Sequence, residues 1–333
     1  MKAFGALNSS IDSIIEFESP IPKPAADEIL VRVRAVSLNP VDTKVRKSLG
    51  TENLTTPRIL GFDASGVIEA VGSEVKSFSI GDEVFYCGDV TRAGSNAELQ
   101  TVQAALVAKK PNSFSFTEAA ALPLVALTAW ELLFERMTDG IIKPGTEILI
   151  INGAGGVGSA LIPLAKSAGL SVVATASRGE TRTWCQQLGA DYVINHRDPL
   201  RPQIEALGFK YFPLIANLHD TEFYWEQTAD LIAPLGAIGL IVETQNPIDI
   251  GNPLRLKSPR IVWEYMPARS RFQTPDMSRQ GEILQEIANR CDAGTFPKLN
   301  LAPAEALTAK SLQAAHHQLQ SASMIGKLCL EIG

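Results

Sequence analysis

Hydrophobic and polar positions follow one rhythm over the first part of the chain, up to about residue 125. Short apolar runs at 29–35, 67–71 and 83–86 approach alternation with period two, and closely spaced glycines separate them. This alternation is typical of strands with one face in water. Short strands between glycine turns favour a compact barrel or sandwich, so we expect a β-rich N-terminal region.

A different rhythm begins near residue 115. Ser115 and Glu118 have the spacing of a capping box, which predicts a helical stretch that continues to about Met137. From residue 145 onward, strands and helices alternate. The predicted strands are 147–151, 171–175, 191–195, 211–218 and 237–242. The helices between them are expected to end at the glycines Gly169, Gly189, Gly208 and Gly236.

Regular alternation of strand and helix predicts a parallel sheet with helices on both faces. Beyond it, Thr274, Pro275 and Asp276 combine an N-cap, a proline suited to the first helical position and an acid suited to the helix dipole. They predict a helix that reaches about Cys291. The last residues, 327–332, form a strand-like segment. The expected fold class is therefore α/β.

The composition narrows the possible function classes. With 333 residues the chain has the length of about two domains. The net charge is −6 and no basic block stands out, so nucleic acid is not an expected partner. The longest apolar run, 119–130, contains Pro123 and is shorter than the ~20 residues that span a bilayer, so no membrane span is expected. The first residues also lack the apolar region of a signal peptide.

Cysteine usage points to a reducing compartment. The chain has four cysteines that lie far apart and form no CxxC pair, Cys87, Cys185, Cys291 and Cys329. Neither a disulfide framework nor a structural zinc site is expected from this spacing, and the cytoplasm is the expected location.

The clearest chemical signal is a glycine-rich turn. Strand 147–151 is followed by Gly153, Ala154, Gly155, Gly156, Val157 and Gly158, then by a predicted helix and another strand. In this context GxGxxG indicates dinucleotide binding. The first glycine allows the tight turn, the second lets the backbone approach the pyrophosphate, and the third lets the helix pack closely. The helix N-terminus then offers N–H donors to the phosphates.

The end of the second strand after this turn bears on the choice of dinucleotide. An NAD site places an acid there to hold the ribose hydroxyls, whereas this chain has Ser177 and Arg178. No carboxylate would repel a 2′-phosphate, and a guanidinium pairs with phosphate in bidentate fashion. We therefore predict NADPH rather than NADH. Ser177 also has capping-box spacing to Glu180, so its alternative role is to start a helix.

Several ordered motifs resemble the medium-chain dehydrogenase/reductase superfamily. They are segments 36–42, 57–67, 81–84, 153–158 and 188–195, and the resemblance covers nearly the whole chain. It looks most like the quinone oxidoreductase branch, including proteins labelled zinc-type alcohol dehydrogenase-like. The resemblance implies a GroES-like catalytic domain at 1–125 and 266–333, with an inserted Rossmann domain at 126–265. It also implies a homodimer, with tetramers in some relatives.

Zinc-dependent members of this superfamily use an early cysteine, a Gly-His-Glu motif and a second cysteine near the domain junction. At the matching positions this chain has Asn39, then Phe62 with Asp63, then the apolar segment 122–124. A phenyl ring has no lone pair for a metal, and catalytic zinc takes three protein ligands from Cys, His, Asp or Glu. We therefore expect no metal site.

Without zinc no Lewis acid lowers the pKa of an alcohol, so simple alcohol oxidation is not favoured. A quinone or an α,β-unsaturated carbonyl is already electrophilic, and hydride transfer places charge on a conjugated oxygen that needs only hydrogen-bond donors. The predicted function is a zinc-independent, NADPH-dependent reductase of these small molecules. Two alternatives stay open: a non-catalytic NADPH-binding redox sensor, and a zinc-free oxidoreductase of unconjugated carbonyls or alcohols.

Three residues are candidates for the catalytic site. The Asn39 amide is predicted to contact substrate or cofactor, although an asparagine before a proline is also a good N-cap. For Lys44 the resemblance implies a place near the nicotinamide ribose and the substrate oxygen, where many quinone reductases have tyrosine. The alternative is that Lys44 is a solvated lysine on a basic face that includes Arg46 and Lys47. For Thr128 the resemblance implies contact with the nicotinamide amide, and the alternative is an ordinary helix residue.

The remaining predicted cofactor contacts also rest on the resemblance. It implies that His196 lies near the adenosine phosphate, that Ile241 and Val242 pass under the nicotinamide, and that Lys327 lies near the cofactor. The alternatives are a plain loop histidine at 196 and a buried central strand at 241–242. The histidine pair at 316–317 is expected on a wet helix face rather than in a metal site.

Overall fold

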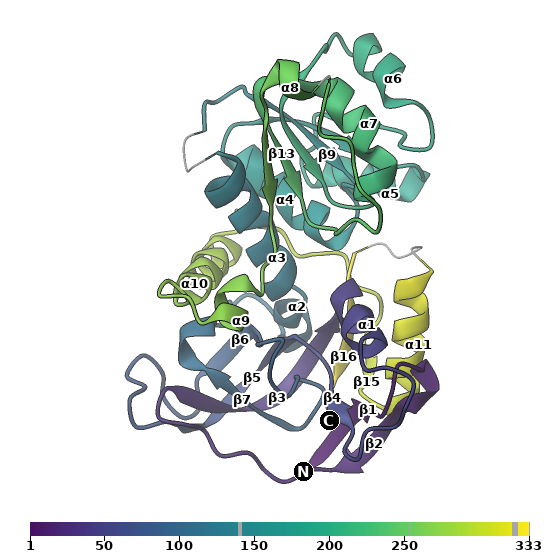
Figure 1. The fold of residues 1–333 in the computed structure, drawn as a ribbon. Helices are drawn as coiled ribbons and strands as arrows, with labels where there is room; N and C mark the ends of the chain where they lie inside the picture. The colour runs from purple at the N-terminus through teal and green to yellow at the C-terminus, as the bar shows by residue number, and fades with distance from the viewer. Residues whose placement is uncertain (139–141, 253, 322–325, 333) are drawn as a thin grey trace. The chain divides into compact units, whose positions relative to one another are not determined.

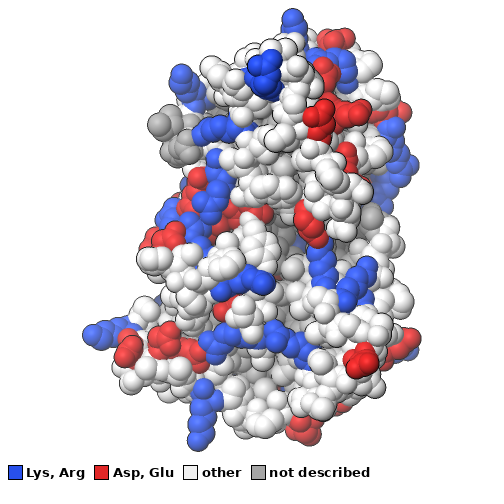
Figure 2. Space-filling model, in the orientation of Figure 1, with Lys and Arg blue, Asp and Glu red and all other residues white. Residues whose placement is uncertain are grey.

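The computed structural model describes residues 1–138, 142–252, 254–321 and 326–332, and Figure 1 shows their fold. The chain divides into two compact units. Unit 1 consists of Met1–Leu127 with Pro267–Gly333, and unit 2 consists of Thr128–Met266. Within the described ranges no helix is both long enough and apolar enough to cross a membrane. Basic and acidic side chains are interspersed over the face drawn in Figure 2.

Unit 1 is built mainly on antiparallel strands; β15 and β16 form a parallel pair. A small sheet has the order β2-β1-β4, with β1 at Lys2–Ala6, β2 at Ile14–Glu18 and β4 at Arg58–Ile59. A larger sheet has the order β15-β16-β3-β5-β6-β8, with β7 also paired to β3. Its strands are β3 (Glu28–Leu38), β5 (Asp63–Val71), β6 (Glu83–Cys87), β7 (Leu99–Gln103), β8 (Val107–Lys109), β15 (Glu305–Ala306) and β16 (Leu328–Glu331).

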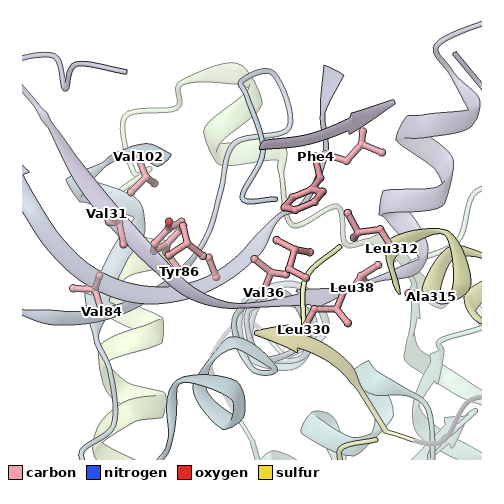
Figure 3. Close-up of a cluster of buried hydrophobic side chains, with 14 of the residues drawn as sticks. Phe4, Val31, Val36, Leu38, Val84, Tyr86, Val102, Leu312, Ala315 and Leu330 are labelled. Atoms are coloured by element: carbon pink, nitrogen blue, oxygen red, sulfur yellow. The ribbon is translucent and has the colours of Figure 1, made fainter. Parts of the chain in front are cut away.

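A core of buried apolar side chains lies against these strands (Figure 3). It includes Phe4 from β1, Val36 and Leu38 from β3, and Leu330 from β16. The amphipathic helix α11 contributes Leu312 and other residues to the same core. The helices of unit 1 are α1 (Pro40–Lys47), α2 (Phe116–Ala120), α9 (Ala268–Phe272), α10 (Arg279–Asp292) and α11 (Ala309–Gln320), with short 3₁₀ turns at Ile11–Ser13 and Ala104–Leu106.

Unit 2 is a parallel sheet with the order β11-β10-β9-β12-β13-β14. Its strands are β9 (Glu147–Ile151), β10 (Ser171–Thr175), β11 (Tyr192–Ile194), β12 (Phe212–Asn217), β13 (Ile232–Leu240) and β14 (Arg260–Trp263). The helices are α4 (Gly156–Ser167), α5 (Gly179–Gln187), α6 (Leu200–Ala206), α7 (Thr221–Leu231) and α8 (Leu254–Lys257). Reversal of strand order at the first strand, β9, is the arrangement of dinucleotide-binding sheets. The predicted α/β class is confirmed.

Most predicted elements are present. Helices α4, α5 and α6 each end two residues before the expected glycine, and these glycines, Gly169, Gly189 and Gly208, have positive φ angles of 81°, 102° and 85°. The expected helix end at Gly236 is wrong. Helix α7 already ends at Leu231, and Gly236 lies inside β13. A Cβ at this glycine would lie 2.7 Å from the Pro213 carbonyl oxygen, so the residue serves a close approach to the neighbouring strand.

Two further helix predictions need correction. The stretch from 116 to 137 is interrupted: α2 ends at Ala120, α3 spans Pro123–Trp130, and Glu131–Met137 is a π-helix. Pro123 has no N–H for the preceding turn, so the chain starts a new helix there. Helix α10 starts at Arg279 rather than after Thr274, because the Thr274 hydroxyl donates to Asp276, which is paired with Arg269.

Candidate functional site

The glycine-rich turn of unit 2 connects β9 to α4. Gly155 is the N-cap of α4, and Asn152 has a φ of 67°. A Cβ at Gly158 would lie 2.5 Å from the carbonyl oxygens of Asn152 and Gly153, and one at Gly153 would lie 2.8 Å from the Ala174 side chain. Larger residues therefore do not fit at these positions. The first N–H groups of α4 have no partner within the helix, which makes this end a suitable donor set for phosphate.

A hydrogen-bonded chain ties this turn to the ends of β10 and β11. The Asn152 backbone N–H donates to the Thr175 hydroxyl at 2.9 Å, and this hydroxyl lies 3.3 Å from Nδ1 of His196. Thr175 is fully buried. The structure thus brings His196 to the glycine turn through one shared hydroxyl group.

Positive charge gathers around His196. Burial lowers the pKa of His196, and the charges of His219, Arg197 and Arg178 lower it further. His196 and Arg197 also line a cavity of about 330 Å³ between the start of α6 and α7. The β10 end of this region carries no acid at 176–178, as the sequence indicated.

Ser177 does not start the following helix. Helix α5 begins at Gly179 and its N-cap is Arg178, whose backbone N–H donates to the Thr181 hydroxyl at 3.1 Å. The capping interpretation of Ser177 is therefore wrong. The Arg178 guanidinium is partly exposed and lies 3.9 Å from the carboxylate of Glu180.

Unit 1 contains a second group of functional side chains, centred on a buried ammonium. Lys327, only 2% exposed, donates from Nζ to Oδ1 of Asn39 at 2.5 Å and to Oδ2 of Asp63 at 3.2 Å. A third, longer bond reaches the Leu38 carbonyl oxygen at 3.4 Å. The Asn39 amide Nδ2 donates to Oδ2 of Asp63 at 2.8 Å, and the Leu124 backbone N–H donates to Oδ1 at 2.8 Å.

Strand register brings these residues together. Leu328 of β16 pairs with Leu38 of β3, which sets Lys327 beside the residue that follows, Asn39. Ser37 of β3 pairs with Asp63 of β5. Asp63 in turn pairs with Cys87 of β6. Four segments that are distant in the sequence therefore meet at one end of the large sheet.

Asp42 extends this group from the first turn of α1. Its Oδ2 accepts the Asn39 backbone N–H at 2.8 Å, and among the described residues its buried Oδ1 has no hydrogen-bond partner. Burial raises the pKa of Asp42 to about 7; the Asn39 N–H opposes the rise, the Asp63 charge adds to it, and Lys327 opposes it. Asp63 accepts three hydrogen bonds and is the better place for a negative charge, so the proton belongs on Asp42.

Cys87 stays a neutral thiol in this group. Burial raises its pKa well above the usual range, and the charges of Asp63 and Asp42 add to the rise. A thiol in such surroundings is not a nucleophile.

The other predicted residues lie on helices α1 and α3 and after strand β13. Lys44 is exposed on α1, and Thr128 is buried on α3. Ile241 and Val242 follow the last residue of β13, and the Val242 carbonyl oxygen accepts a bond from the Thr221 hydroxyl at 2.6 Å.

Two side chains expected on wet faces are buried: Arg46, in the alternative interpretation of Lys44, and His316, in the histidine pair. Arg46 is buried, not part of a solvated face, and its Nε donates to Nδ1 of His316 at 3.3 Å. His316 is also fully buried rather than wet, while His317 is exposed. Burial lowers the pKa of His316 to about 4, with help from the Arg46 charge.

Asp42 and Asp63 were not among the predicted site residues. A signal for them was present: Asp42 and Asp63 stand in the largely apolar segments 36–42 and 57–67, and Lys327 begins the predicted last strand. Unpaired charges are rarely buried, so acids and a lysine in apolar surroundings indicate mutual pairing.

Two protein-family models match the chain. The model described as "Alcohol dehydrogenase GroES-like domain" matches residues 25–112. The model described as "Zinc-binding dehydrogenase" matches residues 156–279.

Individual proteins are similar over most of the length. A zinc-type alcohol dehydrogenase-like protein of Staphylococcus aureus (strain COL) is 43% identical over 322 residues, which cover 95% of this chain and 94% of the relative. A crystal structure described as that of a zinc-dependent alcohol dehydrogenase protein of Rhizobium etli has a TM-score of 0.94 and 40% identity, covering 99% of this chain and 98% of that one. A chloroplastic NADPH-dependent alkenal/one oxidoreductase of Arabidopsis thaliana is 38% identical over 209 residues, 60% of this chain and 52% of its own.

These names imply zinc, but the residues present do not fit it. The Asn39 side chain is bound to an ammonium group, which repels a metal cation, and Phe62 has no lone pair to offer. Within the described part of the chain, no group of three or more His, Cys, Asp or Glu side chains is arranged to hold a metal.

Proposed function

The chain belongs to the medium-chain dehydrogenase/reductase superfamily, and from that premise we propose that it is a zinc-independent, NADPH-dependent reductase of quinones or α,β-unsaturated carbonyl compounds. The observation that carries this proposal is the Lys327–Asn39–Asp63 group. Asn39 and Asp63 stand where the resemblance puts the zinc-site motifs of zinc-dependent relatives, and here they hold an ammonium group instead. An acceptor that is electrophilic by conjugation needs no Lewis acid, only donors for its oxygen.

The glycine turn supports a bound dinucleotide. Glycines at 153 and 158 are required by close contacts, and the α4 N-terminus presents N–H donors. The residues proposed to hold the cofactor come from the predicted set: Gly153, Ala154, Gly155, Gly156, Val157, Gly158, Ser177, Arg178, His196, Ile241 and Val242. When bound, NADPH supplies the hydride.

The preference for NADPH is supported by charge at the end of β10. Arg178, Arg197 and His219 all act on His196 electrostatically, and residues 176–178 include no acid. A cationic surrounding without a carboxylate favours a 2′-phosphate over free ribose hydroxyls. The name of the Arabidopsis relative agrees with this cofactor.

The proposed reaction asks little of the protein's own acid–base groups. Hydride adds to the β-carbon of the acceptor, the carbon–carbon double-bond electrons move toward the carbonyl, and the resulting enolate takes one proton from solvent water. The Asn39 amide is proposed to donate a hydrogen bond to that oxygen. The predicted contacts also form part of this proposal: Lys44 with the nicotinamide ribose and the substrate oxygen, and Thr128 with the nicotinamide amide.

An acceptor panel tests the function. NADPH oxidation is measured with a small quinone, an enone and the saturated ketone that matches the enone. We expect turnover with the first two and little with the third. NADPH binding without turnover on any acceptor would favour the non-catalytic sensor. Equal rates on enone and saturated ketone would favour the carbonyl oxidoreductase.

We also propose a homodimer in the cytoplasm. Strand β14 ends the described sheet of unit 2 and pairs with β13 on one side only. Ile261, Trp263 and Tyr265 along and after this strand are exposed, at 36%, 47% and 47%. An open apolar edge is a site for strand pairing with a second copy. Light scattering on wild type and on Ile261→Lys tests this, and a monomeric wild type would refute it.

The proposed cytoplasmic location is supported by the four cysteines, which are unpaired and suit a reducing compartment.

A further inference from the structure

The buried ammonium of Lys327 leaves the Asn39 amide only one orientation. A lysine ammonium can only donate hydrogen bonds, and an ionised carboxylate can only accept them. Oδ1 of Asn39 must therefore face Lys327, at 2.5 Å, and Nδ2 must face Asp63, at 2.8 Å. A flipped amide would set N–H against ammonium and carbonyl oxygen against carboxylate.

The backbone of Asn39 is also fixed in place. The Asn39 backbone N–H donates to Asp42, and the residue is the N-cap of α1. The side chain is only 2% exposed. One of the two Nδ2 hydrogens is used by Asp63, so one N–H donor is left over.

Positive charge at the carbonyl end strengthens that remaining donor. Hydrogen bonds in a chain polarise one another, and the effect is larger in a low-dielectric interior. Lys327 draws electron density toward Oδ1, which makes the Nδ2 hydrogens more acidic. Asp63 balances the lysine charge, so the amide is polarised inside a neutral pair.

We propose that Lys327 is a positioning residue for the reduction: it fixes and polarises the Asn39 amide so that the free Nδ2–H binds the substrate oxygen as it gains negative charge. This inference rests on the proposed function. The lysine does not touch substrate. It delivers a cation to position 39 from within the chain, at the place where the resemblance puts a metal ligand in zinc-dependent relatives.

This role differs from the cofactor contact that the sequence suggested for Lys327. The ammonium has three acceptors within unit 1, at 2.5, 3.2 and 3.4 Å. An ammonium group has three N–H bonds in all. A direct bond to cofactor would need one of these to be given up.

Steady-state kinetics with an enone at saturating NADPH tests the proposal. We expect Lys327→Met to lower kcat by roughly 10- to 100-fold, the loss of one charge-assisted interaction, with the Kd of NADPH nearly unchanged. Lys327→Arg should recover part of the rate. Asn39→Ala should lower kcat similarly, and the double variant should be no slower than Asn39→Ala alone, because both changes remove the same effect. Lys310→Met, an exposed lysine on α11, is the matched control and should behave as wild type.

Two outcomes would overturn the proposal. Weaker NADPH binding by Lys327→Met with unchanged kcat at saturation would make the lysine a cofactor ligand. Additive losses in the double variant would mean that Lys327 acts independently of Asn39. If Lys327→Met does not fold, Lys327→Met with Asp63→Asn removes both buried charges together and is expected to show the same drop in kcat.

A readout without turnover separates this proposal from the proposed function. The side-chain amide signals of Asn39, identified by their loss in Asn39→Ala, are followed by NMR in the protein without substrate. We expect two distinct amide protons with slow solvent exchange in the wild type and in Lys327→Arg, and faster exchange in Lys327→Met. Unchanged exchange in Lys327→Met would refute the positioning role even if no acceptor is found.

Discussion

The two units prepare their candidate sites in opposite ways. Unit 2 does so by leaving side chains out: at Gly158 a single added carbon would lie 2.5 Å from two backbone oxygens. Unit 1 does so by burying charge, with Lys327 and Asp63 both at most 2% exposed. The first device depends on backbone geometry within one turn. The second depends on partners from distant segments that compensate one another.

This difference teaches where each site is vulnerable. A glycine turn is disrupted when a side chain is added, and a buried ion pair is destabilised when one charged partner is removed. The chain offers a convenient way to observe the units separately, because its four tryptophans all lie in unit 2, at Trp130, Trp184, Trp225 and Trp263. Tryptophan fluorescence therefore reports unit 2, while far-ultraviolet circular dichroism reports both.

The largest expected effect is on the stability of unit 1. Lys327→Met leaves Asp63 as an uncompensated buried carboxylate, and breaking a buried pair in this way costs about 3–5 kcal/mol. Urea unfolding should show a clear shift by circular dichroism and a smaller one by fluorescence. Adding Asp63→Asn should restore much of the loss. Equal shifts by both probes would contradict the contrast between the units.

The next effect concerns the glycine turn of unit 2. Gly158→Ala places a Cβ against backbone oxygens, which forces a shift and should cost roughly 1–3 kcal/mol along with NADPH affinity. Gly179→Ala is the matched control, since a Cβ there meets nothing within 4 Å and its φ is not positive. Only Gly158→Ala should show lower stability in fluorescence-monitored unfolding and weaker binding in an NADPH titration. A stable Gly158→Ala that binds NADPH normally would show that the turn tolerates side chains.

A variant at Arg178 tests whether a side chain, in addition to the glycines, contributes to cofactor binding by unit 2. Arg178→Ala should weaken NADPH binding by about 1–3 kcal/mol, the range for a hydrogen bond to a charged group, and leave NADH binding nearly unchanged. Arg279→Ala, on α10 of unit 1, is the control. Calorimetric titration with both cofactors measures the difference. Equal weakening of both would remove Arg178 from the 2′-phosphate.

The buried titratable groups of unit 1 give the smallest effect, because two of them oppose each other. The pKa of Asp42 is raised to about 7, so folding favours its protonated form and stability falls as pH rises from about 4 to 7. The pKa of His316 is lowered to about 4, so folding favours its neutral form and stability falls as pH drops from about 6.5 to 4. Over the shared range the contributions of Asp42 and His316 have opposite signs.

Single variants should separate these slopes. Asp42→Asn is expected to leave stability rising with pH between about 4 and 6.5, and His316→Asn to leave it falling. Each slope is at most about 1.4 kcal/mol per pH unit, the value for one proton. Circular dichroism across this pH range measures both. Parallel profiles for the two variants would contradict the assignment.

The sequence predicted most of the fold because the signals for it are local. Alternation, glycine positions and helix starts located nearly every strand of unit 2, and the predicted superfamily and α/β class are confirmed. The failures have local causes too. Asp276 is taken by Arg269 instead of starting a helix, and Gly236 serves strand packing instead of ending one.

The candidate site of unit 1 was less accessible to prediction. Asn39 and Lys327 were both selected, but their partnership spans 288 residues and arises from antiparallel register. Register cannot be obtained from a residue's own neighbours in sequence, so Asp63 was missed. Asp42 was missed although its capping-box spacing to Asn39 is local. Cofactor preference, acceptor and catalytic residues remain predictions for the experiments above.

The pairing of β16 with β3 also has a consequence for synthesis on the ribosome. Unit 2 is one continuous segment and has all its strands before residue 267 is made. Unit 1 is completed later: β3 is made early, whereas β16, which pairs with it, and Lys327, which neutralises Asp63, follow unit 2 in the sequence. Until residues 327–331 have been made, the nascent N-terminal half therefore holds an uncompensated Asp63 carboxylate and an open sheet edge along residues 35–38 of β3. We expect chaperones to bind this half first, and C-terminal truncations to destabilise it first.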